Sequence, residues 1–321
     1  MRLSILDQIP RPKGKSVEET IAETLTTVAF AETLGYERYW FAEHHGTKGM
    51  TSSSPEILMA AAAARTTTIH VGSGGILLPQ YSPYKVASQL LQLQSLFPGR
   101  IDGGVGRSPG GNERIRLALS DRRENQLGEY SEKLEELIRF LKGNKGLQAT
   151  PRTKDAPALF SLGLGENSAK LAASLGIGYV FGHFINSTRG QNVHKVYREN
   201  FTAGLMDSPQ ALSAVFVICG ESDEHAEELA ASQDLWLLRT EKGLDSRIPS
   251  NEEAKTVKLR EEDKKIILRN RRRMIIGGPK TVKEQLDILA DKYQSNEWLI
   301  LTNVYDFEEK RRSFERLASV F

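Results

Sequence analysis

Short apolar runs alternate with longer amphipathic segments along the sequence, and this alternation constrains the fold more than any other feature. Eight runs have the length and composition of buried β-strands. Helical periodicity fills the segments between them; Ser16 with Glu19 forms a capping box before one, and Pro55 opens another. Eight strand–helix units predict a parallel sheet closed as an α/β (β/α)8 TIM barrel. The expected strands are residues 3–6, 38–42, 69–78, 100–107, 158–163, 179–185, 211–220 and 297–304.

We expect a single domain over residues 1–321, because no linker or low-complexity tract interrupts this pattern. A doubly wound open sheet is the alternative fold for the same alternation. One segment departs from the rhythm. Residues 239–274, between the seventh and eighth expected strands, are highly charged and too polar to pack inside a barrel. We expect this long charged insertion to be a mobile surface loop with some helix.

Composition and charge argue against several function classes. The formal net charge is +2, so no overall excess of positive charge favours nucleic acid or an acidic membrane as a partner. Cys219 is the single cysteine, which excludes a disulfide within the chain and a cysteine metal cage. The sequence lacks an apolar run of about 20 residues and the pattern of a signal peptide. We therefore expect a cytoplasmic protein in which Cys219 is a buried structural thiol.

Polar residues and glycines gather at the carboxyl ends of the expected strands. Active sites of (β/α)8 barrels lie at this end, because the loops that follow the strands meet there. These positions therefore predict where a site would form. The residues are Asp7, Gln8, Glu43, His44, His45, Thr302, Asn303, Gly182, His183 and the stretches 72–75, 104–108 and 162–168.

Two adjacent histidines, His44 and His45, follow the second expected strand. Neighbouring residues of a strand point to opposite faces, so a regular strand would direct only one of them into the barrel. Two histidines that bind a metal from one strand need an i, i+2 spacing, so this pair weighs against a metal site. Parity alone leaves open which histidine faces inward. The inward one would serve as a hydrogen-bond partner or a general base, since its pKa lies near the working pH.

Two stretches suggest an anion site. Arg107 follows the fourth expected strand and can bind a phosphate through two parallel hydrogen bonds. Gly165, Asn167 and Ser168 begin a helix, where free N–H groups and the helix dipole favour a phosphate. Asn167 or Ser168 could also simply cap that helix. The glycine-rich turn at residues 72–75 would let a planar ring lie against the backbone.

Taken together, these motifs resemble the luciferase-like flavin monooxygenases of bacteria, most closely the single-chain group. The resemblance covers nearly the whole chain and is most specific from Leu3 to Gly111. It rests on ordered motifs rather than on any one of them. They are "RYWFAEHHG", "VGSGGILLPQYSP", "KVASQLLQLQSLFPGRIDGGVGRSPGG" and "GENSAKLAASLG".

The resemblance implies a (β/α)8 barrel that uses reduced FMN as a cosubstrate and molecular oxygen as the oxidant. A separate NAD(P)H-dependent flavin reductase would supply the reduced FMN, and the protein would be a homodimer. No metal is expected. In this family the residue that matches His44 is catalytic. Residues that match Gly74, Gly75 and Ile76 lie under the flavin ring, often with a non-proline cis peptide, and those that match Arg107, Gly165, Asn167 and Ser168 hold its phosphate.

Further expectations concern the substrate and its surroundings. We expect the substrate to enter over Asp7, Gln8 and the charged insertion, which corresponds in place to the mobile lid of the family, with His183 as a further pocket residue. Glu166 should point away from the phosphate, because two anions repel each other. His44 would act as an acid or base, or as a hydrogen-bond donor, in a pocket that excludes water.

Three alternative functions fit parts of the same pattern. A deazaflavin-dependent oxidoreductase would need a similar phosphate site. A flavin-binding protein without turnover is a second alternative, although such a protein has no need of an acid–base residue at His44. A metal-dependent barrel hydrolase is the third, and the spacing of His44 and His45 weighs against it.

Overall fold

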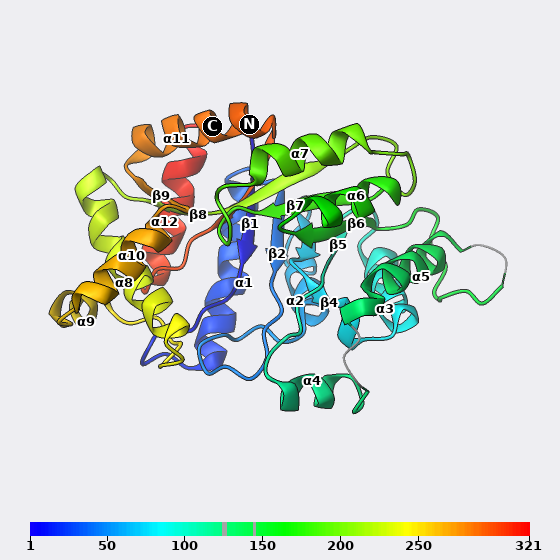
Figure 1. Ribbon diagram of the computed structural model, residues 1–321, viewed down its shortest axis with the longest axis horizontal. Helices are drawn as coiled ribbons and strands as arrows, with labels where there is room; N and C mark the ends of the chain where they lie inside the picture. The colour runs from blue at the N-terminus through cyan, green and yellow to red at the C-terminus, as the bar shows by residue number, and fades with distance from the viewer. Residues whose placement is uncertain (124–126, 144–145) are drawn as a thin grey trace.

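The computed structural model describes residues 1–123, 127–143 and 146–321, and its centre is a closed parallel β-barrel (Figure 1). The strands join in a continuous order, and β10 pairs with both β1 and β8, which closes the barrel. This confirms the expected (β/α)8 TIM barrel and excludes the open doubly wound sheet. The eight barrel strands are β1 (Arg2–Asp7), β2 (Arg38–Phe41), β3 (His70–Ser73), β5 (Ile101–Gly106), β6 (Ala158–Gly163), β7 (Gly178–Gly182), β8 (Ala211–Cys219) and β10 (Glu297–Leu301).

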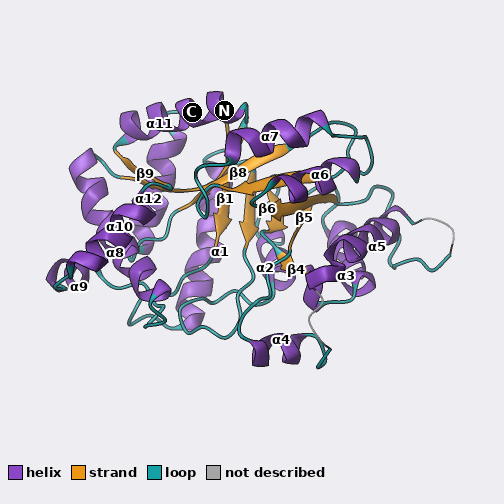
Figure 2. Cartoon of the chain, in the orientation of Figure 1, coloured by secondary structure: helices purple, strands orange, loops and turns teal. Residues whose placement is uncertain are grey.

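Helices surround the barrel, and both chain ends lie close together at one end of it (Figures 1 and 2). Ser16 caps α1 through the expected capping box with Glu19. Within the described residues, no helix is long and apolar enough to cross a membrane. The α-helices are α1 (Val17–Thr33), α2 (Pro55–Ala63), α3 (Pro83–Leu96), α4 (Glu113–Leu119), α5 (Tyr130–Lys142), α6 (Glu166–Ser174), α7 (Gly190–Glu199), α8 (Asp223–Glu241), α9 (Asn251–Thr256), α10 (Glu261–Arg271), α11 (Pro279–Tyr293) and α12 (Phe307–Ala318).

Two apolar layers use opposite faces of the strands. Leu6, Trp40 and Ala42 belong to a cluster inside the barrel, whereas Tyr39 and Phe41 pack between the barrel and the helices. Successive side chains of a strand alternate between these layers. The structure therefore settles the parity that the sequence left open: in β2 the even-numbered residues face inward.

The third expected strand, residues 69–78, is interrupted. Strands β3 and β4 (Ile76–Leu77) both pair with β5, and a non-proline cis peptide joins Gly74 to Gly75 between them. A Cβ atom added at Gly75 would lie 2.9 Å from the carbonyl oxygen of Gly104, and one added at Gly74 would collide with Leu6. Only glycine fits this close approach of the backbone to its neighbours.

The charged insertion contains helices, as the sequence analysis expected. Helix α8 extends through Glu241, and α9 and α10 pack on it through ion pairs such as Arg239–Glu253 at 2.8 Å and Arg271–Asp234 at 2.6 Å. The expected insertion ends where a further strand begins, β9 (Met274–Gly277), which pairs with the second half of β8 and which the sequence analysis did not predict. The sequence analysis also missed α11, which leads from β9 to β10.

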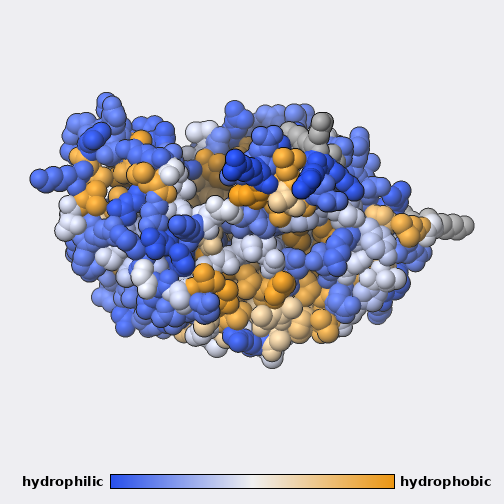
Figure 3. Space-filling model, turned by 90° about the horizontal axis from the view of Figure 1, so that it is seen from below, coloured by the Kyte–Doolittle hydropathy of each residue, from blue (hydrophilic) through white to orange (hydrophobic). Residues whose placement is uncertain are grey.

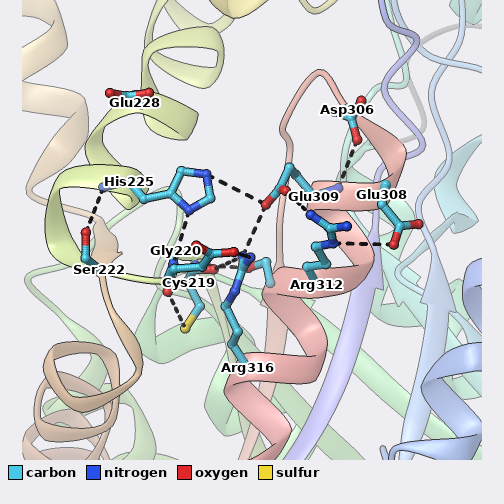
Figure 4. Close-up of polar contacts among 12 residues, drawn as sticks. Cys219, Gly220, Ser222, His225, Glu228, Asp306, Glu308, Glu309, Arg312 and Arg316 are labelled. Atoms are coloured by element: carbon cyan, nitrogen blue, oxygen red, sulfur yellow. Dashed lines mark hydrogen bonds and ion pairs between the residues drawn. The ribbon is translucent and has the colours of Figure 1, made fainter.

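Charged side chains tie α12 to the segment that follows β8 (Figure 4). Nε2 of His225 lies 3.9 Å from Oε2 of Glu309, and Arg316 donates hydrogen bonds to Glu309 and to the carbonyl oxygen of Cys219, each at 3.2 Å. Cys219 is fully buried, and burial raises the pKa of its thiol to about 11. It is therefore a packed core residue rather than a nucleophile.

A buried ion pair network closes the amino-terminal end of the barrel, opposite the loops that follow the strands. Arg38 donates to Asp102 at 2.8 Å and to Glu297 at 2.6 Å. The indole of Trp40 also donates to Asp102, and the hydroxyl of Ser4 donates to Glu297. All of these side chains are buried, so each charge depends on its partners.

We predict that Arg38→Met lowers the free energy of unfolding by about 3–5 kcal/mol, because it removes the buried cation that bridges Asp102 and Glu297. Glu297 would keep only its ion pair with the exposed Arg2, at 3.1 Å. Denaturant titration measures this loss. Arg139→Met is the matched control, since its pair with Glu136 is exposed and is worth about 1 kcal/mol or less. Equal stability losses in the two variants would contradict the structural role of Arg38.

Candidate active site

A cavity of about 1470 Å³ opens at the carboxyl ends of the strands. Figure 3 views this face, where apolar side chains are visible in a hollow and in a broad patch below it. Inward-facing residues of the strands and residues of the loops after β2, β3, β5, β6 and β7 line it. Its apolar wall is formed by Leu6, Leu77, Leu162, Val180, Phe184 and Ala214.

His44 lines the cavity, as the sequence predicted, and its surroundings define its charge. Its backbone N–H donates to the carbonyl oxygen of Ser52 at 2.8 Å. The Nδ1 atom is buried and has no hydrogen-bond partner among the described residues. Burial, with a smaller contribution from the charge that His45 can carry, lowers the pKa of His44 to about 4. The imidazole is therefore neutral at neutral pH. It can donate a hydrogen bond to a ligand or accept one from it, but it carries no extra proton to give away as an acid.

His45 also lines the cavity, so the expectation that only one histidine would face it was wrong. Strand β2 ends at Phe41, and strict alternation no longer holds at His45, four residues later. Nε2 of His45 lies 2.7 Å from Oε1 of Glu43, and the hydroxyl of Tyr81 donates to the same oxygen at 2.5 Å. The sequence could not link Tyr81 to these residues, because no periodicity relates positions 38 residues apart.

The glycine turn contributes backbone to the cavity. Gly74 and Gly75 line it, whereas Ile76 is buried in the layer between the barrel and the helices. The interruption between β3 and β4 changes the alternation, so that Leu77 rather than Ile76 faces the cavity. The backbone of the turn is thus part of the cavity wall, but the side chain of Ile76 is not.

The residues predicted for an anion lie together on one side of the cavity. Arg107 lines it and donates from Nε to the carbonyl oxygen of Leu127 at 3.1 Å. Gly165, Asn167 and Ser168 line it at the start of α6. The Ser168 hydroxyl already donates to the carbonyl oxygen of Gly165 at 2.7 Å, so the N–H groups of the helix, rather than this hydroxyl, are the free donors.

Glu166 also lines this side of the cavity, and its carboxylate accepts a hydrogen bond from Nδ2 of Asn192 at 2.7 Å. This bond holds the carboxylate toward α7.

Tyr130 is a residue that the sequence analysis missed. Its buried hydroxyl lies 2.9 Å from the hydroxyl of Ser161 and close enough to Arg107 to feel its charge. Tyr130 reaches the cavity because the first turn of α5 packs against β5 and β6, and the sequence does not show this contact.

Of the three residues expected in the substrate pocket, only Gln8 lines the cavity. Its Oε1 accepts a hydrogen bond from Nδ2 of Asn303 at 2.8 Å. Asp7 was misplaced, because it faces the helices and bonds to the hydroxyl of Tyr39 at 2.5 Å and to Nζ of Lys310 at 2.7 Å. His183 was misplaced for the same reason: it is buried against α11, 2.9 Å from the hydroxyl of Tyr293.

The cavity has room where a flat, anionic cofactor would need it. A Cβ atom added at Gly106 or at Gly165 would meet no atom within 4 Å, so both backbones are open toward the space between the glycine turn and α6. The imidazole of His44, which also lines the cavity, provides a polar side chain. These features fit a flavin whose phosphate lies near Arg107. Across the parts of the chain that the structure describes, no cluster of His, Cys, Asp and Glu side chains could hold a metal ion.

A (β/α)8 barrel with a cavity at the carboxyl ends of its strands is the architecture of a large class of enzymes, in which the active site lies at this end. Residues 1–293 match the profile of the luciferase-like monooxygenases. The chain therefore belongs to the luciferase-like monooxygenase family.

Three relatives illustrate this membership. The uncharacterized protein YceB of Bacillus subtilis (strain 168) is 54% identical over 100% of this chain and 99% of its own length. The N-acetyl-S-alkylcysteine monooxygenase of the same strain is 34% identical over 99% of this chain and 97% of its own length. The crystal structure of apo-MsnO8 superposes with a TM-score of 0.91 at 32% identity, covering 100% of this chain and 98% of that one.

More distant structures share the fold and differ in cofactor. An oxygenating constituent of 3,6-diketocamphane monooxygenase of Pseudomonas putida, in complex with FMN, has a TM-score of 0.71 at 18% identity, over 99% and 96% of the two chains. An F420-dependent secondary alcohol dehydrogenase has a TM-score of 0.69 at 13% identity, over 100% and 98%. At these identities the likeness shows the fold alone, so it leaves the choice between FMN and a deazaflavin to the site itself.

We predict that Gly106→Val abolishes FMN binding while the free energy of unfolding stays within about 1 kcal/mol of the original, because the new side chain enters open cavity. Fluorescence titration with FMN and denaturant unfolding measure the two effects. Gly104→Val is the contrasting variant, since its side chain would collide with the backbone oxygen of Ser73 and should cost about 1–3 kcal/mol or more. Unchanged FMN affinity in Gly106→Val would place the ring elsewhere.

Proposed function

We propose that this protein is an FMN-dependent monooxygenase that uses reduced FMN and O2 to oxidise a small organic substrate. The observation that carries the proposal is the joint placement of the anion side, the glycine turn and His44 around one cavity. Arg107 and the N–H groups at the start of α6 would hold the phosphate. The backbone at Gly74 and Gly75 would support the ring. Bound reduced FMN supplies the electrons that activate molecular oxygen.

The residues of the chain would orient and protect this reaction rather than perform it. The apolar wall around Leu6 and Val180 excludes water from the reacting region. His44, neutral at neutral pH, would offer one ring nitrogen as a hydrogen-bond acceptor and the other as a donor. Gln8, held by Asn303, would present an amide to the substrate.

A thioether with an apolar substituent is the substrate class that we propose to test first. The relative named N-acetyl-S-alkylcysteine monooxygenase is similar over the full length of this chain. The apolar wall of the cavity suits an alkyl group, and its polar rim suits an amide and a carboxylate. We further propose that a separate NAD(P)H-dependent flavin reductase in the cytoplasm supplies the reduced FMN, and that the protein acts as a homodimer.

We predict that Arg107→Gln weakens FMN binding about tenfold to a hundredfold, since a charge-assisted hydrogen bond contributes about 1.5–3 kcal/mol. Riboflavin, which lacks the phosphate, should bind the variant and the original protein equally well. Titrations with both flavins measure this difference. Arg114→Gln, at an exposed position of α4, is the control. An equal loss for FMN and riboflavin would place the phosphate away from Arg107.

The reaction itself is tested with chemically reduced FMN, an N-acetyl-S-alkylcysteine and 18O2. We expect one labelled oxygen atom in the product and oxygen consumption that depends on the thioether. Binding of a deazaflavin in place of FMN would favour the deazaflavin-dependent oxidoreductase. FMN binding without oxygen consumption or oxygen transfer for every substrate class tried would favour a flavin-binding protein without turnover.

A further inference from the structure

The turn that follows β1 holds one residue in an unusual backbone conformation. Ile9 is buried and has a φ of 48°, in the left-handed region that side chains branched at Cβ rarely adopt. Its N–H donates to Oδ1 of Asp7 at 2.8 Å, and its carbonyl oxygen accepts from the N–H and the hydroxyl of Thr51, each at 3.1 Å. Hydrogen bonds on both sides of Ile9 therefore keep the turn in a conformation that is costly on its own.

Asp7 faces away from the cavity and anchors this turn to the outer layer of the barrel. While its Oδ1 holds the turn, its Oδ2 accepts from the hydroxyl of Tyr39 at 2.5 Å and from Nζ of Lys310 in α12 at 2.7 Å. All three side chains are buried, so the carboxylate depends on the Lys310 ammonium to balance its charge. One buried carboxylate thus connects β2 and α12 to the backbone of the turn.

Gln8 lies between Asp7 and Ile9, and its side chain lines the cavity although only 9% of the residue is exposed. Its Oε1 accepts from Nδ2 of Asn303 at 2.8 Å. Asn303 is held in turn, because its backbone N–H donates to Oε1 of the buried Gln233 at 3.2 Å. The oxygen of the Gln8 amide is therefore occupied. Its Nε2 donates to no residue in the described ranges, so its hydrogens remain for a ligand.

We propose that Gln8 is a specificity-determining residue whose Nε2 donates to an oxygen acceptor of the substrate, and that Asp7 is the positioning residue that directs it. The inference rests on the proposed function. An amide nitrogen donates and does not accept, so it favours a substrate with an amide carbonyl or a carboxylate. A site built to donate a hydrogen bond rejects an analogue that leaves the donor unpaired. The substrate class is thus a thioether that carries such an oxygen, rather than a dialkyl sulfide.

Equilibrium binding tests this donor without turnover. The protein is saturated with oxidised FMN and titrated calorimetrically with an N-acetyl-S-alkylcysteine and with a dialkyl sulfide. Gln8→Glu keeps an acceptor for Asn303 but has no hydrogen to donate, so the affinity for the N-acetyl-S-alkylcysteine should fall about tenfold or more. The affinities for the dialkyl sulfide and for FMN should stay within about threefold. Gln285→Glu, which adds the same charge at an exposed position of α11, is the control.

Two further measurements separate the causes of this loss. Gln8→Met has neither a donor nor a charge, so the same selective loss in this variant would show that the missing hydrogen, rather than repulsion of a carboxylate, weakens binding. A 3-(alkylthio)propanoate keeps the carboxylate and lacks the amide. A loss for this compound in Gln8→Met assigns the carboxylate as the acceptor, and an unchanged affinity assigns the amide carbonyl.

Asp7→Asn and Tyr39→Phe test the positioning role. Asp7→Asn replaces the oxygen that Tyr39 and Lys310 share, whereas Tyr39→Phe removes one hydroxyl only and serves if the first variant does not fold. Each should weaken the N-acetyl-S-alkylcysteine about threefold to tenfold and leave the dialkyl sulfide unchanged. Neither should add to the loss in Gln8→Met, because both act through the same amide. A merely structural role would instead lower thermal stability and weaken FMN and both thioethers together.

Two results would overturn the inference while leaving the proposed function intact. One is a Gln8→Met variant that binds and oxidises the N-acetyl-S-alkylcysteine as well as the original protein does. The other is an equal loss of affinity for both thioethers. An original protein that binds the thioethers with the expected selectivity but oxygenates neither is a different outcome. The proposed function then fails, and the binding role of Gln8 stands.

Discussion

Closure of the parallel barrel is the constraint on which the site depends. The pairing of β10 with both β1 and β8 closes the ring, and every strand pairing in it is parallel, so all the strands run in the same direction. Loops that follow different strands therefore meet at one end, and the ion pair network around Arg38 fills the opposite end. The amino-terminal end of the barrel interior is filled by packed side chains and ion pairs. The carboxyl end is therefore the end that remains open for a ligand.

Within the cavity, two adjacent histidines experience different environments. His44 has an unpartnered buried nitrogen, and its burial favours the neutral ring. His45 and Tyr81 instead both contact the carboxylate of Glu43. Two side chains that look equivalent in the sequence thus differ in their polar partners, because only one of them reaches a carboxylate.

The errors of the sequence analysis share one cause, which is alternation along strands. Asp7 and His183 follow strands at the rim, yet both have the odd parity that faces the helices, where Lys310 and Tyr293 bind them. Gln8 has the inward parity of Leu6 and lines the cavity. Parity could not be read from apolar runs that are buried on both faces, since neither face then carries a polar marker. Strand β9 was missed for a related reason. It has only four residues, which is too short a run for its periodicity to identify a strand.

The sequence by itself determined the barrel, the family resemblance, the glycine turn and the placement of Arg107 and the start of α6 at the rim. These follow from local patterns: apolar runs, helix caps and short motifs that each lie within a few residues. Only the tertiary structure decided which residues face the cavity, that Ile76 turns away from it, and that Tyr81 reaches Glu43 and His45. Such contacts join segments that are distant in the sequence. A local sequence pattern cannot predict them, because they depend on how the side chains of those segments pack in three dimensions.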